Sequence, residues 1–362
     1  MRKKRKIEHL QLIRNLTDGP DTNGFEDIHF VPNCLPGISP GEIDTATVFC
    51  GKRMKVPLLI NAITGGVSEA VAINRALARV ARRLEIPLAV GSQAAALQDK
   101  SCRPSFTVVR EENPEGFILA NLSCAVSVQE ALEAVEMIKA DALQLHLNAA
   151  QETMMPEGEG DLCFHNYRQK IKLLAKTLPV PVVVKETGCG IAREQARELL
   201  DTGVAALDVG GKGGANFILV ESCRKSRNPE QPFSRWGLST AVSLIEVLKV
   251  AGSQLDVVAA GGIRNGLEVA KALCLGAKLA GVAAPLVRNF YRQGELAVEG
   301  YLLQLKKQLQ QAMLLLGVCN WAELQQRPLV ILGDTGKWLE KRGLDPACFA
   351  RRNPLPEIGD SP

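Results

Sequence analysis

The sequence lacks several features that would each assign it to a class of protein. No stretch approaches the roughly 20 consecutive apolar residues that a membrane-spanning helix needs. The basic opening MRKKRK is not followed by an apolar segment, so we do not expect a secretory signal peptide. The ten cysteines are scattered and form no CxxC pair, which argues against structural zinc and against a disulfide framework. These absences predict a cytoplasmic protein with reduced thiols and no membrane association.

An excess of charge of one sign is also missing. The chain has 43 Lys and Arg against 39 Asp and Glu, a net charge of +4 at pH 7, which is too small to predict nucleic-acid binding. Much of the excess lies in MRKKRK, and such a run is most often a solvated tail. With 46% hydrophobic and 23% charged residues, the composition is typical of a soluble enzyme.

One pattern repeats along the chain. A short apolar run ends in glycine, asparagine, serine or a charged residue, and an amphipathic segment with helical spacing follows. Eight such units with no long linker between them predict a (β/α)8 TIM barrel. A doubly wound sheet is the alternative, but no GxGxxG follows the first apolar run. The predicted strands are 57–64, 87–93, 116–123, 142–148, 181–187, 205–211, 256–262 and 279–284.

The repeats divide the chain into three parts of one domain. The barrel repeats occupy 57–289, an N-terminal extension rich in turn residues occupies 1–56, and a C-terminal helical region occupies 290–362, with a long helix over about 291–317. The longest loop after a strand is 212–237, and loops of that length commonly serve as lids or binding loops.

Small residues end the last two predicted strands, in AAGGIR (259–264) and GVAAP (281–285). They let a ligand approach the backbone, and the helix that follows each strand offers free N–H groups and a favourable dipole for phosphate. The run GGKGGAN (210–216) is consistent with a backbone nest for an anion. We therefore predict a phosphate site here, the alternative being that the glycines serve only tight turns.

Polar groups end the earlier strands, where barrel enzymes place their active sites. Thr64, Ser92 and Asn121 would form a neutral hydrogen-bonding ring that suits a flat heterocycle. Alternation places Lys185 inside the barrel with Val183, where a cation requires a carboxylate partner or an anionic ligand such as a reduced flavin. A phosphate site beside such a ring points to flavin mononucleotide, FMN.

The stretch HLNAAQETMMPEGEGD (146–161) carries the densest polar set. Alternation turns Gln144, His146 and Asn148 into the barrel, and Gln151 and Glu152 follow in the loop. A single glutamate suits Mg²⁺, which takes one or two carboxylates together with substrate phosphate oxygens and water. For His146 alone, a satisfied core histidine is the competing interpretation.

Several motifs, taken in order, resemble the type 2 isopentenyl-diphosphate isomerase family. The resemblance extends from residue 5 into PLVILGDTGKWL (328–339), nearly the whole chain, and HLNxxQE is its most specific element. The motifs are RKxxH (5–9), NAxTGG (61–66), GSQ (91–93), HLNxxQExxMPEG (146–158), VKExGxG (184–190), GGKGG (210–214), WGxST (236–240) and GGIR (261–264).

The resemblance implies a (β/α)8 barrel that interconverts isopentenyl and dimethylallyl diphosphate in isoprenoid biosynthesis. It further implies reduced FMN, NADPH or NADH as reductant, Mg²⁺, and a homo-oligomer, either a tetramer or an octamer. The residues implied to contact FMN are Ala62, Ile63, Thr64, Ser92, Asn121, Lys185, Gly210, Ala215, Gly261, Gly262, Ile263, Arg264, Ala283 and Ala284. Those implied to line the substrate are Arg5, Lys6, His9, Ser92, Gln93, His146, Asn148 and Gln151. Glu152 is implied to bind the metal, and Gln151, His146 and Glu152 to carry the catalysis.

Two positions depart from the family pattern. Many members have threonine where Ala215 stands and arginine where Ala94 stands, near the FMN phosphate and the substrate diphosphate respectively. We expect reduced affinity at most, because the backbone amides and the basic N-terminus remain.

The implied reaction adds a proton at C4 of isopentenyl diphosphate and removes one from C2, without net redox change. An electron-rich reduced flavin would stabilise the cationic character at C3 and could carry the proton, while Gln151 and His146 orient the reacting groups.

Three alternatives remain. An FMN-dependent 2-hydroxy-acid oxidase would need a histidine base late in the barrel, and no histidine follows His165. A nucleotide dehydrogenase would need a reactive cysteine in the loop after the sixth strand, where Cys223 stands without a matching glycine–serine loop. A catalytically inactive flavin- or phosphate-binding barrel would bind ligand without turnover.

Overall fold

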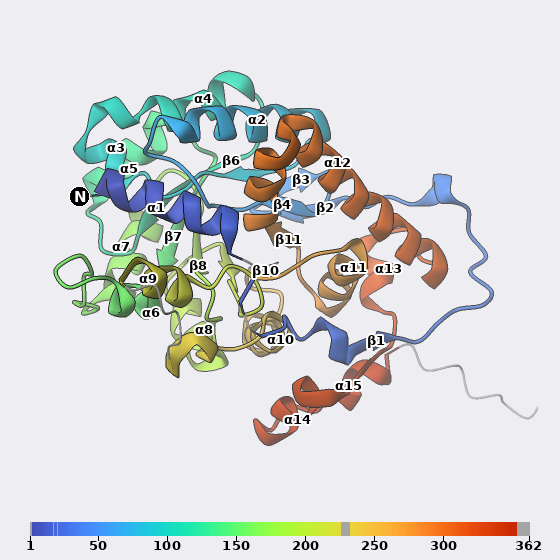
Figure 1. Cartoon of the computed structure of the whole chain (residues 1–362). Coiled ribbons are helices and arrows are strands. Elements are labelled where there is room, and N and C mark those ends of the chain that lie inside the picture. The colour runs from blue at the N-terminus through green and yellow to red at the C-terminus, as the bar shows by residue number, and fades with distance from the viewer. Residues whose placement is uncertain (1, 17, 20, 226–231, 353–362) are drawn as a thin grey trace, which may run out of the picture.

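Eight parallel strands close into a barrel in the order β10-β11-β4-β5-β6-β7-β8-β9 (Figure 1). The computed structural model describes residues 2–16, 18–19, 21–225 and 232–352. Each barrel strand falls within one of the eight predicted strand segments, so the (β/α)8 prediction is confirmed. The strands are β4 (Leu58–Ile60), β5 (Leu88–Ala89), β6 (Ile118–Ser123), β7 (Ala142–Leu147), β8 (Val182–Glu186), β9 (Ala206–Asp208), β10 (Asp256–Ala260) and β11 (Leu279–Val282).

Helices surround the barrel, and their apolar faces pack on the outside of the strands. The outward Val182 and Val184 of β8 belong to this outer core, whereas Val183 belongs to a separate core inside the barrel. The surrounding helices are α2 (Glu69–Leu84), α3 (Ala94–Gln98), α4 (Pro104–Glu112), α5 (Val128–Met137), α6 (Ala149–Met154), α7 (Tyr167–Thr177), α8 (Arg193–Leu200), α10 (Thr240–Ala251), α11 (Gly266–Leu275) and α12 (Ala284–Leu316). Short 3-10 turns lie at Phe25–Asp27, Pro40–Glu42, Lys100–Cys102 and Pro232–Arg235.

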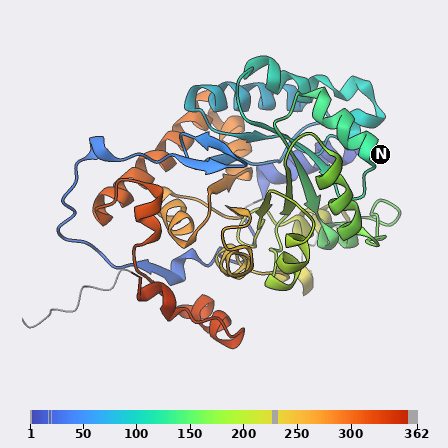
Figure 2. The same ribbon diagram turned by 180° about the vertical axis from the view of Figure 1, so that it is seen from behind.

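The amino-terminal end of the barrel is closed by a hairpin of β2 (Thr47–Phe49) and β3 (Lys52–Met54), drawn in blue in Figure 2. Phe49 and Met54 are buried and belong to the inner core, together with apolar inward-facing residues of the barrel strands. Since this end is filled by side chains, a ligand can enter the barrel only from the carboxyl ends of the strands.

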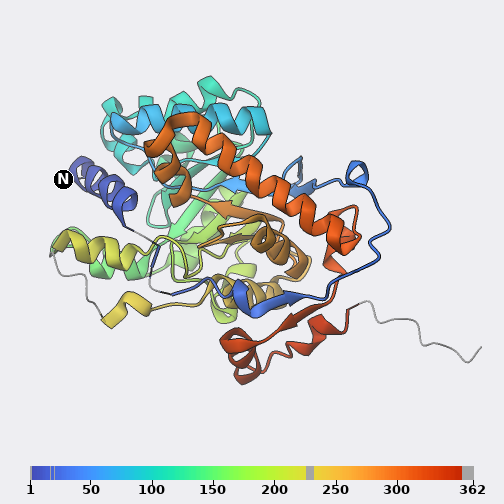
Figure 3. The same ribbon diagram turned by 45° about the vertical axis from the view of Figure 1, so that its right-hand side comes forward.

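The N-terminal extension differs from the turn-rich segment that we predicted. It contains the helix α1 (Arg2–Asn15), which lies beside α9 (Phe217–Lys225) and α12 (Figure 3). The basic opening is therefore the first part of a helix and not a solvated tail, although Lys4 is exposed as expected. The segment 212–237, predicted to be the longest loop after a strand, instead contains the helix α9 in its described part.

The C-terminal region is tied to the N-terminal extension. The strand β12 (Leu329–Ile331) pairs with β1 (Ile28–Phe30) in an antiparallel ladder. The remaining helices are α13 (Trp321–Gln325), α14 (Gly333–Lys341) and α15 (Ala347–Ala350). The predicted long helix corresponds to α12, which begins earlier, at Ala284, and is interrupted by non-helical backbone at Gln293 and Gly294. Within the described ranges, no helix is long and apolar enough to cross a membrane.

Candidate active site

A cavity of about 1300 Å³, measured out to its open mouth, lies at the carboxyl ends of the barrel strands. It collects groups from the N-terminal extension and from the barrel repeats: cations from α1, small residues from the ends of β9, β10 and β11, and the polar segment that follows β7. The predicted site residues that line it are Arg5, Lys6, His9, Ala62, Ile63, Ser92, Asn121, His146, Asn148, Gln151, Glu152, Lys185, Gly210, Ala215, Gly261, Gly262, Ile263, Ala283 and Ala284.

Gln93 is a predicted substrate residue that the structure assigns elsewhere. Its side chain is fully buried, and its Nε2 donates to the carbonyl of Ala134 (2.9 Å) while its Oε1 accepts from the amide of Asn121 (3.0 Å). Both polar ends are therefore used to join the backbone of β6 to helix α5, and this side chain does not line the cavity.

Arg264 and Thr64 also lie outside the cavity lining. The guanidinium of Arg264 donates to the carbonyl oxygens of Gly262 (2.8 Å) and Gly213 (2.5 Å), so it supports the glycine segments from outside. Thr64 is buried, and its hydroxyl has no hydrogen-bond partner among the described residues. For both residues, direct contact with a ligand in this cavity is not supported by their positions.

The glycine segments after β9 and β10 pack against each other through their backbones. A Cβ atom on Gly214 would lie 2.5 Å from the amide nitrogen of Gly262, and one on Gly261 would lie 2.0 Å from the carbonyl oxygen of Gly211. Side chains are excluded at these positions, so backbone groups form this wall of the cavity. We call it the glycine wall (Gly210, Gly211, Gly214, Gly261 and Gly262).

The two helices that follow β10 and β11 differ in what they offer an anion. The side chain of Asn265 caps α11 by accepting from the amide of Glu268 (2.9 Å). No described side chain caps α12, and its N-cap residue Ala283 and its first residue Ala284 line the cavity. Pro285 has no N–H, and the amide of Leu286 donates to the carbonyl oxygen of Ala283 (3.0 Å), so the amide of Ala284 is left to donate to a ligand. Together with the glycine wall, it suits a phosphate.

Lys185 is a buried cation, 7% exposed, in the wall formed by β8. Its Nζ donates to the carbonyl oxygen of Glu186 (2.6 Å), and no carboxylate within the described residues lies at ion-pair distance. No close ion pair therefore satisfies this lysine, although the buried carboxyl groups of Asp208 and Glu186 lie near enough for its charge to oppose the rise that burial causes in their pKa. A cation in this position favours an anionic ligand.

Two cations of α1 line the cavity at the carboxyl ends of the barrel strands. Lys6 Nζ donates to the carbonyl oxygens of Gly65 (2.8 Å) and Ser92 (2.6 Å), and Arg5 Nη1 contacts the sulfur of Met155 (3.2 Å). Three positive charges, from Arg5, Lys6 and Lys185, therefore border one space. With the glycine wall they make the cavity suitable for a polyanionic ligand.

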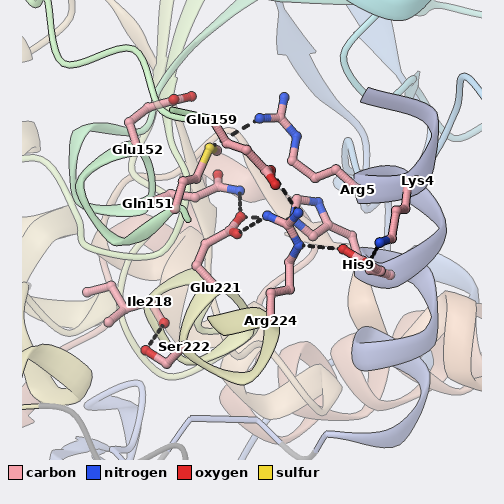
Figure 4. Close-up of polar contacts among 12 residues, drawn as sticks. Lys4, Arg5, His9, Gln151, Glu152, Glu159, Ile218, Glu221, Ser222 and Arg224 are labelled. Carbon is pink, nitrogen blue, oxygen red and sulfur yellow. Dashed lines mark hydrogen bonds and ion pairs between the residues drawn. The ribbon is translucent and has the colours of Figure 1, made fainter. Parts of the chain in front are cut away.

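A buried acidic group lies where the sequence predicted a loop. Glu221 of α9 is fully buried and accepts hydrogen bonds from His9 Nε2 (2.8 Å) and Gln151 Nε2 (2.8 Å), as Figure 4 shows. Burial alone would raise its pKa, but the hydrogen bonds from His9, Gln151 and Arg224 lower the pKa of Glu221 to about 2. An ionised Glu221 thus holds Gln151 and His9 in position.

Arg224, one turn along α9, joins three segments of the chain. It pairs with Glu221 (2.6 Å), with Glu8 of α1 (2.8 Å) and with Glu159 of the loop after α6 (2.7 Å), and its side chain is 5% exposed (Figure 4). These contacts hold α1 against the cavity. Sequence reasoning missed both residues, although Glu221 and Arg224 in FILVESCRK have the i, i+3 spacing of a helical ion pair.

Glu152 lies at the rim of the cavity with both carboxylate oxygens held. Oε1 accepts from Asn148 Nδ2 (2.7 Å), and Oε2 accepts from the amide of Asp161 (2.9 Å). Among the described residues, no group of three or more His, Cys, Asp and Glu side chains could hold a metal ion. A metal at Glu152 would therefore share its coordination sphere with a ligand and with water, as Mg²⁺ does.

Comparison with known proteins identifies a family and a set of close relatives. A family model described as FMN-dependent dehydrogenase matches residues 14–151 and 133–331. The isopentenyl-diphosphate delta-isomerase of Moorella thermoacetica is 47% identical over 341 residues, 94% of this chain and 97% of that protein. The proteins of the same name from Symbiobacterium thermophilum and Bacillus licheniformis are each 42% identical, over 98% and 97% of this chain and 99% of each relative.

Solved structures with the same fold are more distant in sequence. A flavocytochrome b2 variant with pyruvate bound has a TM-score of 0.68 at 22% identity and covers 91% of this chain and 84% of its own. A mandelate oxidase variant with the monooxide FMN adduct has a TM-score of 0.62 at 17% identity, over 90% of this chain and 92% of its own. These similarities establish the barrel architecture alone.

Proposed function

Because the chain belongs to the FMN-dependent dehydrogenase family and, within it, to the isopentenyl-diphosphate delta-isomerases, we propose how its cavity carries out that reaction. The protein interconverts isopentenyl and dimethylallyl diphosphate, and we assign to it bound FMN, NADPH or NADH as reductant, and Mg²⁺. The observation that carries the assignment is the convergence of the glycine wall, Lys185 and the α1 cations on one cavity.

The cavity fits FMN in three respects. The glycine wall and the α12 N-terminus offer backbone N–H groups for the phosphate, and Lys185 offers a positive charge for the ring. Ser92 and Asn121 add neutral hydrogen-bonding groups to the lining. When bound in its reduced form, FMN supplies an electron-rich ring that stabilises positive charge and a nitrogen that can carry a proton.

Replacing Gly214 with alanine tests the phosphate assignment. The added Cβ would meet the Gly262 amide at 2.5 Å, and overpacking of this kind typically costs about 1–3 kcal/mol. We expect the dissociation constant of FMN, measured by fluorescence quenching, to rise about tenfold or more. Gly300→Ala in α12 is the control, because a Cβ there has no atom within 4 Å, and we expect it to leave FMN affinity unchanged. Equal affinity in both variants would contradict the assignment.

The remaining residues suit the substrate diphosphate. Arg5 and Lys6 would hold its oxygens, and Glu152 would bind the Mg²⁺ that bridges to them. The clamp formed by Arg224 keeps α1 over the cavity, which would exclude water from the site. Gln151, fixed by Glu221, and His146 would orient substrate and cofactor while the proton is added at C4 and removed from C2.

Replacing Glu152 with glutamine tests the metal assignment. Loss of the carboxylate charge should raise the Mg²⁺ concentration for half-maximal isomerase activity by about tenfold or more. The control is Glu157→Gln, a change of the same kind at an exposed position in the following loop. If the two variants require the same Mg²⁺ concentration, Glu152 does not bind the metal.

The cofactor requirements are tested by an isomerase assay without oxygen, in which FMN, reductant and Mg²⁺ are omitted in turn. We expect each omission to abolish product. An oxidase would instead consume oxygen with a 2-hydroxy acid, and an inactive barrel would bind FMN without turnover. The absence of any histidine after His165 disfavours the oxidase.

We further propose a cytoplasmic location and a homo-oligomer. All ten cysteines are free, which suits a reducing compartment. Light scattering on the purified FMN-bound protein would test the oligomer, and a monomeric mass would contradict it.

A further inference from the structure

A chain of hydrogen-bonded side chains crosses the barrel at the floor of the cavity, from Asp208 to His146. Asn61 Nδ2 donates to Asp208 Oδ2 (2.6 Å), and Gln144 Nε2 donates to Asn61 Oδ1 (3.1 Å). Asn121 Nδ2 donates to Gln144 Oε1 (3.1 Å), and Asn121 Oδ1 lies 3.0 Å from His146 Nδ1. The carboxylate and the three amides are buried, so water does not compete for these contacts. We call Asn61, Gln144 and Asn121 the amide relay.

The direction of the relay is fixed by backbone groups. An amide side chain can be turned end for end, but a backbone N–H can only donate. The amide of Ala62 donates to Asn61 Oδ1 (2.8 Å), and the amide of Gly210 donates to Asp208 Oδ1 (3.1 Å). Asn61 therefore presents its oxygen to Gln144 and its nitrogen to Asp208.

Once Asn61 is fixed, each later member of the relay has one orientation. Gln144 must turn its nitrogen towards Asn61, which leaves its oxygen for Asn121. Asn121 must then donate to Gln144 and present its own oxygen to His146. An oxygen acceptor opposite His146 Nδ1 requires a hydrogen on that nitrogen.

The other ring nitrogen is left for the cavity. His146 lines the cavity, and its Nε2 has no hydrogen-bond partner within the described residues. Burial, followed by the positive charges of Lys185, Lys6 and Arg5, lowers the pKa of His146 to about 3. The ring is therefore neutral at pH 7, with an unprotonated nitrogen beside three cations.

We propose that the amide relay holds His146 as the Nδ1–H tautomer, and that a diphosphate bound in the cavity adds one proton from solvent at Nε2. The second step rests on the proposed function, since it assumes a diphosphate beside this ring. The charged groups that face the ring are Lys185 of β8 and Arg5 and Lys6 of α1, and all of them oppose its protonation. An entering polyanion neutralises them and would repel the Nε2 lone pair, so both effects favour the imidazolium form. Asp208 and the amide relay are thus positioning residues for His146.

The tautomer is read by nitrogen NMR of the FMN-bound protein labelled with ¹⁵N in the histidine rings. The chain has four histidines, and the His146 signals are those that a His146→Gln variant loses. We expect the chemical shift of a protonated nitrogen for Nδ1 and of an unprotonated nitrogen for Nε2. The reverse assignment in the unliganded protein would overturn the role of the relay.

A matched pair of variants tests whether the relay is the cause. Gln144→Leu interrupts the amide relay at its middle residue, and we expect His146 to populate both tautomers in this variant. Gln144→Met, which keeps the length of the side chain, replaces it if the leucine variant folds poorly. Gln308→Leu removes an amide that accepts from Gly266 outside the cavity, and should leave the tautomer unchanged. A Gln144 variant that folds and keeps a single Nδ1–H tautomer would overturn the proposal.

Proton uptake is measured by titrating the protein with inorganic diphosphate and Mg²⁺ in two buffers of different protonation enthalpy. The wild-type protein should take up about one proton more per bound diphosphate than His146→Gln. The variant lacks the imidazole, so its proton uptake serves as the reference for the protonation changes of the ligand itself. Diphosphate that binds both proteins with equal uptake would overturn the second step. If diphosphate does not bind at all, both the proposed protonation of His146 and the substrate assignment are contradicted. The role of the amide relay is then still decided by the NMR measurement on the unliganded protein.

Discussion

Replacing Arg224 with methionine is expected to lower the free energy of unfolding by about 3–5 kcal/mol. The guanidinium is the shared partner of Glu8, Glu159 and Glu221, and its side chain is 5% exposed. Without it, the fully buried Glu221 and its neighbours would repel one another in a poorly solvated site. The expected result is therefore a large loss of stability, measured by urea denaturation of the FMN-free protein.

A matched surface arginine provides the control. Arg83 pairs with Glu295 and Glu299 but is 42% exposed, so Arg83→Met should cost less than about 1 kcal/mol. If Arg224→Met is as mild as this control, the cluster does not fasten α1 to the barrel. Arg224→Lys should recover part of the stability, because it keeps the charge but cannot reach all three carboxylates at once.

Replacing Lys185 with methionine is expected to lower the midpoint potential of bound FMN by roughly 30–90 mV, equivalent to one to three powers of ten in the preference for reduced over oxidised cofactor. Lys185 is a buried cation without a carboxylate at ion-pair distance among the described residues. Its charge therefore remains available to favour an anionic reduced ring. The potential is measured by reductive titration against reference dyes.

Lys185→Arg keeps the charge and should keep most of the potential. A second control is Lys212→Met, because Lys212 is already paired with Asp21 at 3.0 Å. An unchanged potential in Lys185→Met, with FMN bound, would contradict the assignment of Lys185 to the cofactor.

The barrel could be predicted because its strands are short apolar runs that end in small or polar residues. The same periodicity could not reveal α1 and α9. Among the α1 residues whose side chains are described, only Leu10 and Ile13 are buried, and the segment is strongly charged, so no apolar stripe marks the helix. In α9, a nine-residue helix follows a glycine-rich segment, and its position depends on the charge cluster around Arg224. Both helices are held by contacts distant in sequence.

The inward polar face of β7 could likewise be predicted, because alternation in a strand decides which side chains share a face. A motif gives proximity to a site but not the direction of a side chain, and the side chain of Gln93 is directed at Ala134 and at the amide of Asn121 and not into the cavity. Asp208 and Glu221 were missed because each is a single acidic residue in an apolar segment. Their importance follows from hydrogen-bond partners on other elements, and these are visible only in the folded chain.

In the proposed reaction, this site moves a double bond without net oxidation or reduction. The most direct measurement is the amount of dimethylallyl diphosphate formed per NADPH oxidised, with isopentenyl diphosphate, FMN and Mg²⁺ under exclusion of oxygen. We predict product in large excess over NADPH consumed, because the reductant only generates the active cofactor. Product equal to the NADPH oxidised, or no product from protein that has bound FMN, would contradict the proposed isomerase reaction.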